Sequence, residues 1–138
     1  MQATSVDLRV ADLMTIDPIV VSVDASIENA EDLLRQNRIT GLPVVDTDGM
    51  LVGVISQTDL LHLALPRVQA LIRNSESGVR VGEVMSTPPV TIDCGASLRD
   101  AARVMNDEQL HRLVAIGTHG RPIGVIAAMD FVALAAEG

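Results

Sequence analysis

The chain has 138 residues, a formal net charge of −8 and 48% hydrophobic residues, among which Phe131 is the single aromatic one. This length suits one compact domain or two very small ones around an aliphatic core, and the acidic balance without aromatic stacking platforms argues against nucleic acid as a partner. Cys94 is the only cysteine, which excludes an intrachain disulfide and favours the cytosol, and no apolar run resembles a signal peptide or a membrane span.

The first half of the chain predicts six elements. Ser26 is a good helix N-cap with Glu28 in the first turn, and helical spacing of apolar residues follows it. Two apolar runs flank Asp46-Thr47-Asp48-Gly49, which is a hairpin signal. The expected elements, in order, are a helix near 10–14, a strand at 19–23, a helix after residue 26, strands at 42–45 and 50–56, and a helix from Gln57.

The second half repeats this order. The chain matches itself without a gap at an offset of 71 residues, the spacing from Met14 to Met85, so that the helix from Gln57 has its counterpart at Ala128. Such a constant offset indicates duplication, and the two halves should share an α/β fold and pack about a pseudo-twofold axis. The predicted domains are a first motif at 6–65, a connecting helix and linker at 66–80, and a second motif at 81–136.

Ser56 and Asp59 stand where a hairpin strand gives way to a helix. A carboxylate there can accept hydrogen bonds from the two vicinal hydroxyls of a ribose, and a serine hydroxyl can donate to a phosphate. The same Ser-x-x-Asp spacing is also that of an ordinary helix N-cap with an acidic first turn. The residues alone leave both interpretations open. The second half repeats the aspartate as Asp130 but has Ala127 in place of the serine.

Three stretches carry a resemblance to a known family: LMTIDPIVVSVDASIENA, ITGLPVVDTDGMLVGVISQTDLL and VMSTPPVTIDCGASLRDA. They resemble the cystathionine-β-synthase (CBS) domain, and the duplication resembles the tandem pair of such domains that is called a Bateman module. The second half departs from the family pattern at AIGTHG (115–120) and at Ala127. Because the chain ends shortly after the second motif, we expect a freestanding module.

The resemblance implies a nucleotide site. CBS pairs are sensors of AMP, ADP, ATP or S-adenosylmethionine that regulate a partner. By this analogy Ser56 and Asp59 bind phosphate and ribose, and the basic pair His111-Arg112 faces the phosphates in the cleft between the halves. Asp130 should be the weaker equivalent, because Ala127 lacks the hydroxyl of Ser56. Adenine, without aromatic rings to stack on, would lie between the aliphatic side chains of Val20, Val21, Leu42 and Ile55, with the backbone of Gly41-Leu42-Pro43 at its edge.

Catalysis and metal binding have little support in the sequence. No nucleophile is paired with a base, and the three histidines lack ligand-like spacing with the cysteine, so we expect neither an enzyme nor a metal site. The leading hypothesis is a regulatory sensor of an adenosine ligand that acts through a partner protein. The alternative is a ligand-independent dimerisation or scaffold module with decayed sites, for which Ala127 and Gly117 are the signals.

Two helical segments, 60–65 and 131–136, are apolar on nearly every face, and the connecting segment adds Val68, Leu71 and Ile72. A small monomer cannot readily bury such helices all round, and exposed apolar surface of that size usually marks an interface. As repeat equivalents, the two segments should lie side by side. The sequence therefore predicts a twofold-symmetric homodimer. The alternative is that this surface binds a different protein.

Overall fold

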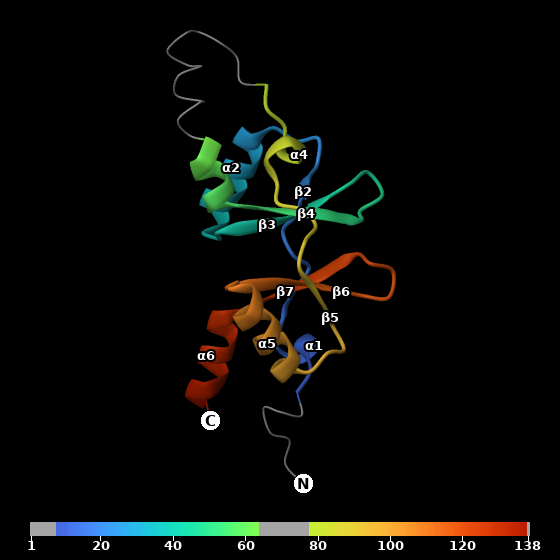
Figure 1. Ribbon diagram of the computed structural model, residues 1–138, viewed down its shortest axis with the longest axis vertical. Coiled ribbons are helices and arrows are strands. Elements are labelled where there is room, and N and C mark those ends of the chain that lie inside the picture. Colours follow the sequence, from blue (N-terminus) through green and yellow to red (C-terminus); the bar gives the residue numbers. More distant parts are fainter. Residues whose placement is uncertain (1–7, 64–77, 138) are drawn as a thin grey trace. The chain divides into compact units, whose positions relative to one another are not determined.

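The computed structural model of the protein describes residues 8–63 and 78–137 (Figure 1). The described residues form two compact units: unit 1 contains 8–18 and 90–137, and unit 2 contains 19–63 and 78–89. Each unit therefore takes its first helix from the opposite half of the sequence. The predicted segments at 6–7 and 64–77, with Val68, Leu71 and Ile72, lie outside the described residues.

Unit 2 contains a three-stranded sheet in the order β2-β3-β4. The strands are β2 (Val21–Ser22), β3 (Gly41–Val45) and β4 (Leu51–Ser56). β2 and β3 are parallel, so their connection needs a crossover and contains helix α2 (Ile27–Asn37), whereas β3 and β4 form an antiparallel hairpin. A helix begins at Gln57 and continues to the end of the described segment at Leu63, and the short helix α4 (Val81–Val84) completes the unit.

Unit 1 repeats this arrangement with one added strand. Its elements are α1 (Val10–Leu13), β1 (Thr15–Ile16), β5 (Thr91–Asp93), α5 (Leu98–Glu108), β6 (Arg112–Ile116), β7 (Pro122–Ala127) and α6 (Ala128–Glu137), and its sheet has the order β1-β7-β6-β5. The cross-strand pair Val44–Gly53 of unit 2 corresponds to Ala115–Gly124 in unit 1, and the same register shift follows in both hairpins. In each unit the helices lie on one face of the sheet (Figure 1).

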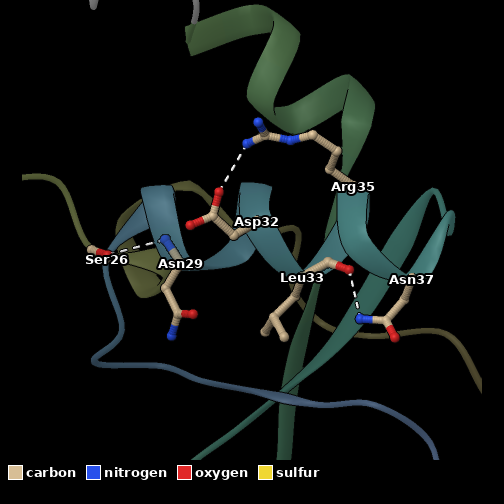
Figure 2. A network of polar contacts seen from close by, with 6 residues as sticks. All are labelled: Ser26, Asn29, Asp32, Leu33, Arg35 and Asn37. Atoms are coloured by element: carbon tan, nitrogen blue, oxygen red, sulfur yellow. Dashed lines mark hydrogen bonds and ion pairs between the residues drawn. The ribbon is translucent and has the colours of Figure 1, made fainter.

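The predicted helix caps are confirmed. Ser26 Oγ accepts a hydrogen bond from the Asn29 N–H over 3.1 Å (Figure 2), and Ser97 caps α5 in the same way. On the exposed side of α2 an ion pair joins Arg35 to Asp32 over 2.8 Å. The two serine caps satisfy helix-end donors and fix where each helix begins, so the starts of these helices follow from the sequence.

The predicted hairpin turn is also confirmed. Asp46 Oδ1 accepts hydrogen bonds from the N–H groups of Asp48 (2.9 Å) and Met50 (3.0 Å). Gly49 has a φ of +81°, in the left-handed region that suits glycine. Asp46 and Asp48 thus serve the turn, as the sequence indicated.

Each unit has its own aliphatic core. In unit 2 the helix residues Ala30 and Leu34 pack with sheet residues such as Leu42 and Val44, and Val81 of α4 joins them. The core of unit 1 consists of the following buried residues: Val10, Leu98, Ala101, Met105, Leu113, Ala115 and Ile126. Val10 and Val81 are both fully buried, so the short first helices are anchored by one valine each.

Strand β1 was not predicted. Its two residues, Thr15 and Ile16, are exposed and show no alternation, so they carry no local strand signal. The strand exists because this segment pairs antiparallel with β7. The strand predicted at 19–23 is shorter than expected, because only Val21 and Ser22 pair with β3.

Candidate functional site

Ser56 and Asp59 form a reciprocal hydrogen-bond network at the end of β4. The Ser56 N–H and Oγ–H both donate to Asp59 Oδ2, over 2.9 and 3.1 Å, and the Asp59 N–H donates to Ser56 Oγ over 3.3 Å. The pair therefore caps the helix that begins at Gln57. Gly41, at the start of β3, lies opposite Ser56 in the hairpin register.

Ser86 is a third member of this network that the sequence analysis missed. Its Oγ–H donates to Asp59 Oδ1 over 2.9 Å, so both carboxylate oxygens of Asp59 carry hydrogen bonds. A signal for it exists in the repeat, because Thr15 stands at the equivalent position and also has a hydroxyl. A hydroxyl-bearing residue after a methionine in both halves does not by itself predict a contact with the aspartate, because only the fold brings the two segments together.

The apolar residues assigned to adenine binding differ in exposure. The side chains of Leu42 and Ile55 are fully buried and belong to the core of unit 2, and Val21 is only 3% exposed. Val20 is 37% exposed and is thus the one of this set whose side chain is open to a ligand. Leu42 and Ile55 would support a binding surface from behind.

Unit 1 carries the equivalent of this site without the serine. The Ala127 N–H donates to Asp130 Oδ2 over 2.8 Å, which matches the Ser56–Asp59 contact, but there is no hydroxyl at position 127. Arg112, the counterpart of Gly41, lies opposite Ala127. Burial lowers the pKa of the Arg112 guanidinium from its ordinary value, and the negative charge of Asp130 acts in the opposite direction. His111 is exposed, and its carbonyl oxygen accepts from the Ala128 N–H over 2.7 Å.

The structure thus groups the predicted residues into two sets, one in each unit. Gly41, Ser56 and Asp59 lie together in unit 2, whereas Arg112 and Asp130 lie together in unit 1. An ionised carboxylate offers about four acceptor positions and no donor, so the chemistry available at Asp59 is recognition of hydroxyl or N–H groups. Across the described ranges, no group of three His, Cys, Asp or Glu side chains is arranged to hold a metal ion.

Unit 1 also has a groove of about 620 Å³ between α5 and α6. Its apolar lining is Ala102, Met105, Leu110, Ala128 and Phe131, and its polar lining is Asn106, Gln109 and His111. On α6, Met129 is 70% exposed and Val132 is 56% exposed. Apolar side chains are thus available for contact along this helix. Within residues 8–63 and 78–137, no helix has the length and hydrophobicity that a membrane crossing requires.

Comparison with known proteins identifies the repeat. The model of the CBS domain family matches residues 10–65 and again residues 81–137. The chloroplastic CBS domain-containing protein CBSX1 of Arabidopsis thaliana is 29% identical over 139 residues, which cover 86% of this chain and 59% of the relative. The inosine-5'-monophosphate dehydrogenase of Mycobacterium tuberculosis is 32% identical over 120 residues, which cover 86% of this chain but only 21% of the enzyme.

Solved structures agree with this match. A crystal structure of CBSX2 from Arabidopsis thaliana in complex with AMP is 34% identical, has a TM-score of 0.80, and is matched over 94% of this chain and 96% of that one. The chain spans less than two thirds of the curated relatives CBSX1 and inosine-5'-monophosphate dehydrogenase, whereas it covers nearly all of the crystallised CBSX2 chain.

Proposed function

The chain belongs to the CBS domain family and carries two CBS domains in tandem, and from this premise we propose that it is a regulatory module that binds an adenosine-containing ligand. AMP, ADP, ATP and S-adenosylmethionine are the candidates. The observation that carries the proposal is the Asp59 carboxylate, held at the end of β4 by Ser56 and Ser86. The AMP complex of the similar CBSX2 chain supports the ligand class.

In the proposed site the Asp59 carboxylate accepts hydrogen bonds from the ribose hydroxyls, and the backbone of Gly41-Leu42-Pro43 lies at the edge of the adenine. The buried Leu42 and Ile55 side chains support this surface, while Val20 touches the ring. His111 and Arg112 supply positive charge for the phosphates. Guanidinium groups suit phosphate because their donors match its oxygens in pairs. The module acts by binding, without catalysis or a metal, and passes its state to a partner protein.

The two repeats should not bind equally. Ser56 gives the Asp59 site a hydroxyl that Ala127 does not give the Asp130 site. We therefore expect one tight site per chain, at Asp59, and a weak or empty one at Asp130.

Calorimetric titration with the four candidate ligands tests this proposal. Asp59→Ala should weaken binding by about 1.5–3 kcal/mol, or about 10- to 150-fold, because it removes hydrogen bonds to a charged group. Asp130→Ala should weaken binding less. Asp48→Ala is the matched control, since it removes an exposed carboxylate from the hairpin turn of the same unit. Equal affinity in the wild type and Asp59→Ala, or two identical sites per chain, would contradict the assignment.

A ligand-independent dimerisation module is the second candidate. The α5–α6 groove and the exposed Met129 and Val132 side chains favour a homodimer, which we propose for the sensor as well. Light scattering at micromolar concentration separates a dimer from a 14.6 kDa monomer. A bound ligand at a hundred times its Kd should raise the free energy of unfolding by about 2.7 kcal/mol, and the melting temperature with it. If the protein is a dimer and none of the four ligands raises its melting temperature, the scaffold is favoured over the sensor.

The cytosol remains the proposed location, on the basis of the single cysteine. The relative CBSX1 is chloroplastic by name. Fluorescence of a tagged full-length protein in its own cells is the direct measurement.

A further inference from the structure

The Ser86 hydroxyl reaches Asp59 from a segment that is firmly held. The Ser86 N–H donates to the Val54 carbonyl over 2.8 Å, and the Ser86 carbonyl accepts from the Val54 N–H over 3.1 Å. This pair of backbone hydrogen bonds places the residue beside β4, although Ser86 is 27 positions from Asp59 in sequence. The backbone pairing of Ser86 with Val54 therefore positions the Ser86 hydroxyl next to the Asp59 carboxylate.

Glycine at position 53 permits this close approach. A Cβ there would lie 2.6 Å from Met85 Sδ, closer than real Cβ contacts allow, and 3.0 Å from the Ser86 carbonyl oxygen, which is a very tight contact. Unit 1 has the same arrangement, with Gly124 against Met14 and Thr15 opposite Val125. Both repeats thus hold a hydroxyl-bearing residue beside the strand that leads to the aspartate.

Most acceptor positions of the Asp59 carboxylate already receive hydrogen bonds from within the chain. Oδ2 accepts two hydrogen bonds from Ser56, and Oδ1 accepts one from Ser86. With about four positions on a carboxylate, about one remains free, whereas a vicinal diol brings two donors. One of the serine donors must therefore release the Asp59 carboxylate when both ribose hydroxyls bind to it.

Ser86 is the donor that can leave most easily. The Ser56 N–H has no alternative partner within the helix, and the Ser56 Oγ that donates to Oδ2 also accepts the Asp59 N–H as the helix cap, so both Ser56 donors stay in place. Ser86 is exposed, so its released hydroxyl can bond to water at little cost. Its backbone pairing to Val54 does not depend on the side chain.

We infer that the Ser86 hydroxyl is a placeholder that occupies the position of one ribose hydroxyl at Asp59 and is displaced when a vicinal diol binds. This inference rests on the proposed function and makes Ser86 a determinant of ribose selectivity. A ligand with both hydroxyls must break the Ser86–Asp59 hydrogen bond, whereas a 2′-deoxy ligand can use the free acceptor position.

The test is calorimetric titration of AMP and 2′-deoxy-AMP into wild-type protein and Ser86→Ala. Ser86→Ala should bind AMP roughly two- to tenfold more tightly, which corresponds to the usual net value of one hydrogen bond. Its affinity for 2′-deoxy-AMP should change by less than about twofold, so the preference for ribose increases. Ser86→Gly is a second variant without the hydroxyl, and Ser86→Thr, which keeps it, should behave like the wild type.

Thr15→Ala is the matched control, because it removes the equivalent hydroxyl in unit 1 and should leave AMP binding at the Asp59 site unchanged. If AMP binds the wild type but Ser86→Ala binds it equally or more weakly, the placeholder role is wrong and the proposed function stands. Equal tightening for AMP and 2′-deoxy-AMP also refutes selectivity through Ser86. If the wild type does not bind AMP, the proposed function fails and this inference with it.

Discussion

Exchanging the residues at the matched positions 56 and 127 measures how much the serine hydroxyl, which Ala127 lacks, contributes to the free energy of unfolding. Ser56→Ala removes a cap whose Oγ accepts the Asp59 N–H over 3.3 Å and donates to Asp59 Oδ2 over 3.1 Å. Both distances lie slightly beyond the usual ranges, so the loss of unfolding free energy should fall in the lower part of the usual N-cap value, about 0.5–1 kcal/mol. Ala127→Ser should stabilise the protein by about 0.5–1 kcal/mol, because the Ala127–Asp130 contact already has the matching geometry.

Urea unfolding followed by circular dichroism is the assay, with the melting temperature as a second readout. A change of 1 kcal/mol should move the melting temperature by about 3 °C in a chain of this length. The double exchange, Ser56→Ala with Ala127→Ser, should return stability close to that of the wild type if the two caps are independent. The reasoning fails if Ala127→Ser destabilises the protein, or if Ser56→Ala leaves its stability unchanged.

AMP titration of the same variants separates the two roles of Ser56 that the sequence left open. If its hydroxyl donates to a phosphate in the complex, Ser56→Ala should lose about 1.5 kcal/mol or more of binding free energy, the lower end for a hydrogen bond to a charged group. If it only caps the helix, AMP affinity should stay within about twofold of the wild type, and the stability loss remains.

Two further predictions concern packing and assembly. Gly53→Ala should destabilise the protein by about 1 kcal/mol, because its Cβ would press on the Ser86 backbone carbonyl at 3.0 Å and displace the flexible Met85 side chain. Gly117→Ala should be nearly neutral, because its Cβ would meet Ile123 at 3.5 Å. Urea unfolding compares the two, and equal losses would contradict the assigned clash. Leu61→Glu combined with Phe131→Glu should convert a dimer to a 14.6 kDa monomer in light scattering, since Leu61 is 70% exposed and Phe131 lines the α5–α6 groove. An unchanged mass would place the interface elsewhere.

Features that depend on neighbouring residues were determined by the sequence itself. The cap at Ser26, the turn at Asp46 to Gly49 and the start of a helix at Gln57 all appear where they were predicted. Each rests on contacts between residues a few positions apart, so residue type and spacing suffice to fix it. The repeat also carried the α/β fold from one half to the other, since equal spacings give equal registers.

Contacts between distant segments were decided only by the tertiary structure. The packing of α1 with the second repeat, the pairing of β1 with β7 and the bond from Ser86 to Asp59 each join parts of the chain that show no local signal for one another. Val10 and Val81 look alike in sequence, and nothing local says in which core each is buried. Such contacts are selected by the combined burial of apolar side chains and backbone pairing in the folded chain, which no short stretch of sequence contains.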